Sequence, residues 1–150
     1  MIQKISCGLC EQDRNEQDGS EVIYRNQQLR VVLVDDANYP GFCRVIWQQH
    51  IAEMTDLPIV DRSTLMRTVC QVEAAQREVL QPHKINLAAL GNMVPHMHWH
   101  VIPRYADDAH FPHPVWATPV RQTDEKVLQQ RRGLLPALRA AVIRHVSCNG

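Results

Sequence analysis

The sequence predicts an α+β fold in which a mainly antiparallel β-sheet of about five strands packs with one long helix and a C-terminal helix. Segments with the composition of β-strands occur in two groups, and a helical pattern follows each group. This order favours an antiparallel sheet over a doubly wound one, in which single strands and helices alternate. No internal repeat or flexible linker divides the 150 residues, so we expect one domain over residues 1–150.

The first group contains three short candidate strands. Glu21–Arg25 and Leu29–Val34 are rich in β-branched and apolar residues, and three polar residues separate them, so we expect a hairpin. A polar loop, Glu11–Ser20, precedes this hairpin. Residues 35–41 contain Asp, Asn, Pro and Gly, which favour turns, and they lead to a third strand at Phe42–Trp47.

A long amphipathic helix is predicted next. Its apolar residues recur mainly at spacings of three and four, which places them on one helical face: Leu65, Val69, Val72, Ala75, Val79 and Leu80. We expect this helix to run from Arg62 to about Leu80, because Pro82 cannot continue it.

Two more strands and a second helical stretch complete the order. Lys84–Gly91 is predicted as a buried strand and His96–Arg104 as the strand after it. The C-terminal helix is expected to begin near Asp124 and to run toward Val146, with a break at one of two residues that disfavour helix interiors, Gly133 or Pro136.

Charge and composition exclude several classes of protein. Sixteen Lys and Arg residues balance sixteen Asp and Glu residues, and the isoelectric point is near 7.1. This balance argues against nucleic acid or membrane partners bound through bulk positive charge. No apolar run approaches the roughly 18 residues of a spanning helix. Met1–Cys7 lacks the apolar core of a signal peptide, which predicts a cytoplasmic protein whose five cysteines are thiols or metal ligands.

Histidine is the unusual component, because six of the eight lie between residues 83 and 113. Within residues 96–102 histidine alternates strictly with apolar residues. On a strand this alternation places the apolar side chains in the core and three imidazoles on the opposite face: His96, His98 and His100. At about 3.3 Å per residue the outer two attach roughly 13 Å apart, too far to bind one small ion together without a bend. Neighbouring rings can share a substrate, or one can bind a metal while another reacts covalently.

The alternative is a half-exposed strand whose polar residues happen to be histidine. The period of two favours a functional site, and so does the preceding Gly91–Asn92 turn, whose backbone N–H groups can hold an anion. An imidazole is nucleophilic near neutral pH, and a phosphoryl or nucleotidyl group is a natural electrophile for it.

This segment resembles the motif of the histidine triad (HIT) family of nucleotide hydrolases and transferases, His-φ-His-φ-His-φ-φ with φ apolar. Residues 96–102 match every position of it. The resemblance extends through Gly91–Asn92 and the segment from Tyr24 to His50. It covers about residues 7–104, and residues 105–150 are then a C-terminal extension peculiar to a subgroup. It implies the HIT fold and, as is usual in the family, a homodimer.

The resemblance also implies residue roles, of the kind found in dinucleoside polyphosphate hydrolases and phosphoramidases. His98 would attack the α-phosphorus of a nucleoside phosphate anhydride, phosphoramidate or ester, and the nucleotidyl-His98 intermediate would pass to water or another acceptor. His100 would hydrogen-bond a phosphate oxygen, and Asn92 would hold the phosphate or the leaving group. Asp35 matches the position that binds the ribose, with Asp36 as its competitor; a simple turn is the alternative for both.

Two departures remove polar groups from the implied pocket. Met93 follows Asn92 where many relatives have Ser or Thr, and Phe42 follows Pro40–Gly41 where several branches have a histidine. These departures motivate a second hypothesis, a nucleotide-binding or sensing protein with little or no turnover. A third hypothesis is a metalloenzyme whose catalytic metal is bound by the triad itself: His96, His98 and His100.

Cys7-Gly8-Leu9-Cys10 is a C-x-x-C pair, the spacing at which two thiolates can bind one zinc ion. By itself this signal is weak, because two buried thiols or a redox pair can share it. Several HIT branches complete such a pair with two histidines, and this chain has His50 and His96 at those positions. The resemblance therefore implies a structural Cys2His2 zinc site, in which four protein ligands leave no open position for substrate.

The extension carries weaker signals. Residues 106–122 contain several prolines and no clear period, so we expect an irregular but packed segment. Arg104 is expected either to face phosphate or to end its strand in solvent. Packing is the expectation for three further side chains, with closure over the pocket of the same or a partner subunit as the alternative: His110, His113 and Trp116.

Overall fold

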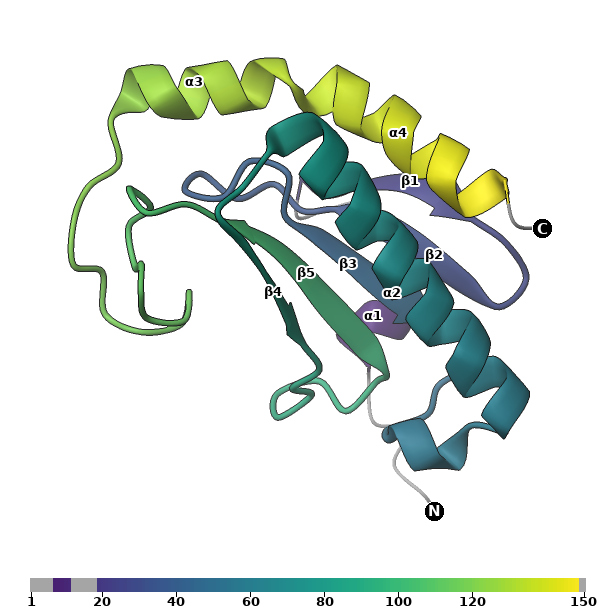
Figure 1. Cartoon of the computed structure of the whole chain (residues 1–150). Coiled ribbons are helices and arrows are strands. Elements are labelled where there is room, and N and C mark those ends of the chain that lie inside the picture. The colour runs from purple at the N-terminus through teal and green to yellow at the C-terminus, as the bar shows by residue number, and fades with distance from the viewer. Residues whose placement is uncertain (1–6, 12–18, 149–150) are drawn as a thin grey trace.

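The computed structural model describes residues 7–11 and 19–148. Its sheet has five strands in the order β1-β2-β3-β5-β4, and every neighbouring pair is antiparallel (Figure 1). The predicted α+β class, the antiparallel sheet and the first hairpin are therefore confirmed. The strands are β1 (Glu21–Arg25), β2 (Leu29–Leu33), β3 (Cys43–Trp47), β4 (Lys84–Ala88) and β5 (His98–Arg104).

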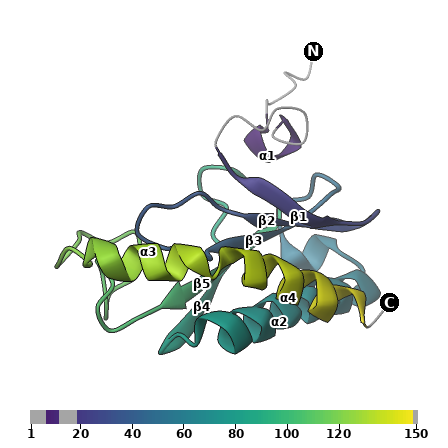
Figure 2. The ribbon, with the colours of Figure 1, turned by 90° about the horizontal axis from the view of Figure 1, so that it is seen from above.

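The helices divide between the two faces of this sheet. They are α1 (Gly8–Glu11), the 3-10 helix η1 (Met54–Asp56), α2 (Ile59–Leu80), α3 (Glu125–Gly133) and α4 (Leu135–Ser147). Helices α2 and α4 pack against each other below the sheet, whereas α1 lies on the other side (Figure 2). Leu134 separates α3 from α4, which confirms the predicted break. Within the described residues, none of the helices is both long enough and apolar enough to span a bilayer.

The main core lies between the sheet and the pair α2 and α4. Its most completely buried members come from every layer: Leu29, Val31, Val45, Leu65, Val69, Val101 and Leu138. Gly41 shows how closely the turn before β3 approaches these helices. Its φ is +93°, and a Cβ atom there would lie 2.5 Å from a methyl carbon of Leu80 and 3.3 Å from one of Leu138. Glycine is therefore required at this position both by conformation and by space.

Helix α2 begins one turn before the expected Arg62. Its first residues, Ile59 and Val60, are apolar but 76% and 69% exposed, so they do not belong to the apolar face that defined the expected helix. The expected loop Glu11–Ser20 and the segment Met1–Cys7 fall largely outside the described residues.

The two strands around the histidines are shorter than expected. Strand β4 ends at Ala88 rather than Gly91, and β5 begins at His98 rather than His96. Between them the chain leaves the β4–β5 ladder, and Met97 bonds on the side of β3: its N–H donates to the carbonyl of Ile51 at 2.7 Å and its carbonyl accepts from the N–H of Trp47 at 3.0 Å. His96 therefore lies before β5, and its side chain does not have to point to the same face of the sheet as those of His98 and His100.

The outer face of the sheet is covered by irregular segments instead of long helices. Over β2 and β3, Leu9 of α1 packs against Val32 and Ile46. Over β5, Val115 packs against a second apolar cluster that contains Phe42 and Ile102. The outer surface between α1 and the segment that contains Val115 holds the side chains of His98 and His100 from β5.

Candidate active site and metal centre

His98 is held in one ring orientation by the backbone next to it. Its Nδ1 lies 2.6 Å from the carbonyl oxygen of His96. A carbonyl only accepts hydrogen bonds, so Nδ1 donates the proton and the neutral ring keeps its lone pair on Nε2. Burial lowers the pKa of His98, and the positive charge of Arg44 lowers it further. The neutral, nucleophilic form is thus favoured near neutral pH.

His100 follows on the same face of β5. The centroids of the His98 and His100 rings are 4.9 Å apart, and the Phe42 ring packs 5.6 Å from His100 on the other side. Burial, the neighbouring His98 and the charge of Arg44 together lower the pKa of His100 to about 4. A neutral ring beside His98 can offer one N–H to a phosphate oxygen.

Both rings line a cavity of about 490 Å³ on the outer face of the sheet. This volume lies within the range of small-molecule sites. The turn of residues 90–94 forms one wall and brings Asn92 to the same cavity. Leu9 and Trp116 contribute further apolar surface, from α1 and from the extension. The cavity therefore combines a polar floor with apolar edges.

The two predicted ribose-binding residues lie elsewhere. Neither Asp35 nor Asp36 is among the described residues that line the cavity. The Asp36 carboxylate accepts the backbone N–H groups of Asn38 at 2.9 Å and Tyr39 at 3.2 Å, which is the geometry of a turn. Asp35 lies beside Gly19, at the start of the segment that leads into β1.

Sequence reasoning missed one cation of the site. Arg44 on β3 is paired with His100 in the β3–β5 ladder, and its guanidinium carbon lies 5.7 Å from the centroid of the Phe42 ring. It is the permanently charged side chain among the described residues that line the cavity. The alternation of residues 42–47 places Arg44 on one face of its strand, but the register that brings it opposite His100 is a long-range property.

The predicted metal ligands meet in one cluster at the edge of the site. One sulfur or nitrogen atom from each of four residues lies within 4.8 Å of all the others: Cys7, Cys10, His50 and His96. Nδ1 of His96 lies 3.5 Å from Sγ of Cys7, 3.4 Å from Sγ of Cys10 and 3.2 Å from Nδ1 of His50. This group can hold a metal ion.

The three separations from Nδ1 of His96 lie close to those around a tetrahedral ion. Bonds of about 2.0–2.3 Å to nitrogen and sulfur give ligand–ligand edges of roughly 3.3–3.8 Å in a tetrahedron. Nε2 of His96 lies 2.6 Å from the carbonyl oxygen of Trp47, so it donates its proton there and leaves the Nδ1 lone pair for the cluster. Burial and the neighbouring Cys7 raise the pKa of Cys10, and a bound cation opposes this by stabilising the thiolate.

The structure thus separates the three histidines of the motif. The His96 side chain belongs to the metal cluster, while His98 and His100 line the cavity. The bend before β5 produces this separation, so the three rings do not form one straight row. Among the described residues, the possible metal group contains His96 and not His98 or His100.

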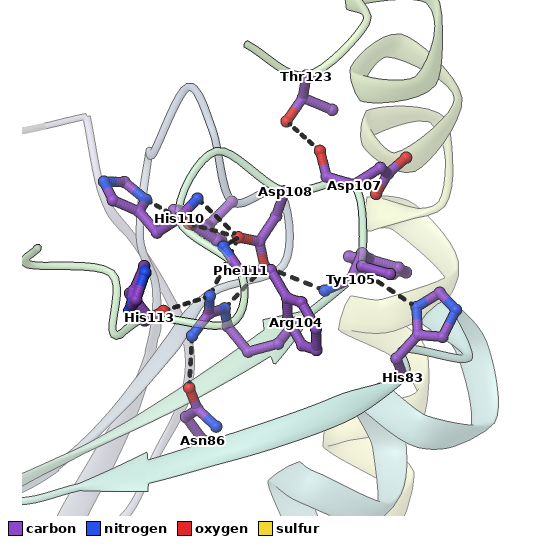
Figure 3. Close-up of polar contacts among 12 residues, drawn as sticks. His83, Asn86, Arg104, Tyr105, Asp107, Asp108, His110, Phe111, His113 and Thr123 are labelled. Atoms are coloured by element: carbon purple, nitrogen blue, oxygen red, sulfur yellow. Dashed lines mark hydrogen bonds and ion pairs between the residues drawn. The ribbon is translucent and has the colours of Figure 1, made fainter. Parts of the chain in front are cut away.

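Arg104 is neither exposed nor in the cavity, contrary to both expectations. Its side chain is 2% exposed and that of Asp108 is 1% exposed, and the two form a salt bridge of 2.7 Å (Figure 3). Burial raises the pKa of Asp108, but hydrogen bonds from Arg104 and from backbone N–H groups outweigh this and lower it to about 2. Residues 105–113 of the extension follow β5 directly and cover the end of this strand.

Of the aromatic and histidine residues of the extension, His110 is buried and Trp116 is exposed at the cavity. His110 is buried, as predicted, and its Nδ1 lies 2.5 Å from the hydroxyl of Tyr39, which also contacts Asp108 at 3.0 Å. Because Asp108 can only accept, the hydroxyl donates to it and Nδ1 of His110 donates to the hydroxyl oxygen. Trp116 is 56% exposed and lines the cavity, so the packing prediction is wrong for this residue.

Comparisons with known proteins agree with this geometry. The model of the HIT domain family matches residues 15–107. The AP-4-A phosphorylase of Mycobacterium tuberculosis is 28% identical over an alignment of 96 residues, and the match covers 60% of this chain and 49% of that protein. The chain therefore spans about half the length of the curated relatives it matches.

Several solved structures share the fold. A histidine triad protein from Bradyrhizobium japonicum is 31% identical with a TM-score of 0.67, over 89% of this chain and 94% of the other. A histidine triad protein from Marinobacter aquaeolei VT8 is 30% identical with a TM-score of 0.64, over 86% of this chain and 95% of the other. A Zn-bound histidine triad family protein from Mycobacterium smegmatis has the same fold at 22% identity, with a TM-score of 0.63 over 96% of this chain and 98% of its own.

Proposed function

Because the chain belongs to the histidine triad (HIT) domain family, we propose that it is a nucleotide hydrolase or nucleotidyltransferase that works through a nucleotidyl-His98 intermediate. The observation that carries the proposal is the fixed ring of His98 in the cavity, with Nδ1 bonded to the His96 carbonyl and the lone pair left on Nε2. The curated relatives named AP-4-A phosphorylase support a nucleotide substrate.

The proposed reaction has two displacement steps. Nε2 of His98 forms a bond to the α-phosphorus while the bond from phosphorus to the leaving oxygen or nitrogen breaks, and the leaving group takes the electron pair. An oxygen of water or of another acceptor then attacks the same phosphorus, loses its proton and displaces His98. The His100 ring, Asn92 and the Arg44 guanidinium all line the cavity, where they can stabilise charge on the phosphate oxygens.

We propose Asp35 as the ribose-binding residue, with Asp36 as the alternative. The position of both in the family pattern supports this role, although neither lines the described cavity. The Asp36 carboxylate already accepts hydrogen bonds from the backbone of its own turn, so Asp35 is the favoured residue of the two. Asp35→Ala is expected to weaken AMP binding much more than binding of 2′,3′-dideoxy-AMP, whereas an equal loss for both ligands contradicts the role.

The second candidate is a nucleotide-binding or sensing protein with little turnover. Met93 favours it, because this residue lines the cavity, is 95% exposed and brings no hydroxyl to the leaving-group side. Tight binding of nucleotide without turnover would support this candidate over the first.

We propose that the cluster of four ligands is a structural zinc site of the Cys2His2 type. The separations given above fit zinc, and the Trp47 carbonyl presents the correct nitrogen of His96. Zinc at this position would fix the loop that contains Cys7 and Cys10 against the residue whose carbonyl orients His98. The site needs cysteines in the thiolate form, which supports a reducing compartment, the cytoplasm.

We also propose a homodimer, with residues 1–150 of each copy as one catalytic domain. Strand β4 is the last strand of the sheet, so the outer edge of its backbone is available for pairing with a second copy. Leu87 and Leu90 beside this edge are 37% and 49% exposed. Light scattering after gel filtration is expected to give twice the chain mass, and Leu87→Asp is expected to shift it toward the monomer.

The test of the function combines turnover with trapping of the adduct. Purified protein is offered diadenosine polyphosphates and adenosine phosphoramidates, and the denatured enzyme is examined by mass spectrometry after short reaction times. We expect a mass increase of one nucleotidyl group on the peptide that contains His98, and its loss together with turnover in His98→Ala. Turnover that persists in His98→Ala contradicts the proposed mechanism.

A further inference from the structure

The extension after β5 is anchored from inside the protein. The Arg104 guanidinium donates to the carbonyl oxygen of His113 at 2.7 Å while it is paired with Asp108 (Figure 3). Further along the chain, Arg121 donates to the carbonyls of Asp108 at 2.8 Å and Phe111 at 2.6 Å. The segment between residues 105 and 121 is therefore fixed at both ends by buried or backbone-directed bonds.

This anchoring carries one aromatic side chain to the catalytic cavity. Residues 114–117 form a turn in which the N–H of Ala117 donates to the carbonyl of Pro114 at 3.0 Å. Val115 packs downward on the cluster of Phe42 and Ile102. The next side chain, Trp116, stays 56% exposed and lines the cavity together with His98 and His100. A large ring is thus held in solvent on a fixed turn, at the wall of the site.

Two further exposed apolar side chains belong to the edge of this cavity. Leu90 is 49% exposed and Met93 is 95% exposed, and both line the same cavity. Such a group of exposed apolar side chains beside a polar floor is typical of a binding surface. The floor contributes Arg44 and two imidazoles, which suit an anion. A ligand that fits both parts has a phosphate and, within the same cavity, a flat apolar group.

We propose that Trp116 is a substrate-binding residue that stacks on a flat aromatic ring attached to the reacting phosphate. This rests on the proposed function for the identity of the phosphate, but Trp116 lies beyond residues 15–107, where the family model matches. The ring comes from one of two sources, the nucleobase of the transferred nucleotide or an aromatic group on the leaving side. The pair Arg104 and Asp108 positions Trp116 without touching the ligand.

Binding is measured by calorimetry in a His98→Ala background, so that turnover does not interfere. The first pair of ligands is AMP and ribose 5-phosphate, which differ in the nucleobase. The second pair is two adenosine phosphoramidates, one of phenylethylamine and one of ethylamine, which differ in the ring on the leaving side. We expect Trp116→Leu to weaken binding of the aromatic ligand of one pair by about 5- to 150-fold, the usual effect of removing a stack between a base and an aromatic side chain. The other member is expected to change less than about twofold.

The response of the two pairs identifies the source of the ring. A selective loss for AMP assigns the nucleobase, and a selective loss for the phenylethyl compound assigns the leaving group. Trp116→Phe is expected to keep most of the preference, because it retains a ring. Val120→Ala is the matched control, since Val120 is also an exposed apolar residue of the extension, at 52%; it is expected to change nothing.

Equal affinities of Trp116→Leu and its parent for all four ligands overturn the proposal. So does a loss that is the same for both members of each pair, or a change of oligomeric state in Trp116→Leu, which would place the ring in a subunit interface. The result is separable from the proposed function. If Trp116 discriminates between the ligands while protein with an intact His98 forms no nucleotidyl adduct, the stacking role stands and the catalytic proposal fails.

Discussion

Removal of the Asp108 carboxylate is expected to cost more stability than any other single polar change in the extension. The two oxygens of Asp108 accept six hydrogen bonds. Two come from Arg104, at 2.7 and 3.1 Å, and one comes from the hydroxyl of Tyr39 at 3.0 Å. Three come from backbone N–H groups, those of Tyr105 at 3.1 Å, His110 at 3.0 Å and Phe111 at 2.7 Å.

The magnitude follows from what Asp108→Ala leaves behind. The Arg104 side chain is 2% exposed, so it becomes a buried charge without its counter-ion, which typically costs about 3–5 kcal/mol. For a chain of this size that corresponds to a fall in Tm of about 10 °C or more. Arg104→Met is expected to cost less, because Asp108 keeps four donors and can take up a proton once the guanidinium is gone.

Urea unfolding followed by far-UV circular dichroism measures both variants, with Asp108→Asn as the closest isostere. We expect the order of losses Asp108→Ala, then Asp108→Asn, then Arg104→Met. The reasoning is refuted if Asp108→Ala loses less than about 1 kcal/mol, or if Arg104→Met is the more damaging change. A normal unfolding free energy for Asp108→Ala would mean that water reaches the Arg104 guanidinium in the folded protein.

Three further predictions concern the metal, the charge and the pH. Protein prepared under reducing conditions is expected to contain one zinc ion per chain by elemental analysis, and Cys7→Ser is expected to lose most of it; full zinc content in that variant contradicts the ligand set. Arg44→Met is expected to raise the pKa of His100 above about 4 in an NMR titration and to slow turnover by tenfold or more, because a positive charge leaves the cavity; an unchanged titration argues against their proximity. The free energy of unfolding is expected to fall as the pH drops from 6.5 to about 4. The pKa of His100 is about 4 in the folded protein and 6.5 in the unfolded chain, so the unfolded chain binds more protons in this range. A further loss is expected below pH 3.8 as the contribution of Asp108, whose pKa is about 2, disappears, and a flat profile from pH 7 to 3 would contradict both shifts.

The order and type of the main elements could be predicted because local patterns decide them. The alternation in His96–Ile102 and the three–four spacing from Leu65 onward each describe one face of one element. The predicted bounds were wrong where the first residues of an element do not lie on its buried face, as at Ile59. They were also wrong where a long-range hydrogen bond ends a strand. The bond from Met97 to the carbonyl of Ile51 cannot be seen in either segment alone.

The candidate site divides along the same line. The motif predicted His98, His100 and Asn92, and the structure brings all three to one cavity. Arg44 was missed because a strand register places it. For Trp116 the sequence offered closure over the pocket only as the alternative to packing, because a chain of bonds from the buried Arg104 places this residue. Neither arrangement has a signature in the neighbouring sequence.

The distribution of helices over the two faces of the sheet separates two tasks that many small enzymes combine. The main apolar core lies on the face that α2 and α4 cover, while the walls around His98 lie on the other face and come from α1, from the turn of residues 90–94 and from the extension (Figure 2). Substitutions of the exposed side chains of these walls, Met93 and Trp116, can therefore alter which molecules bind with little effect on folding.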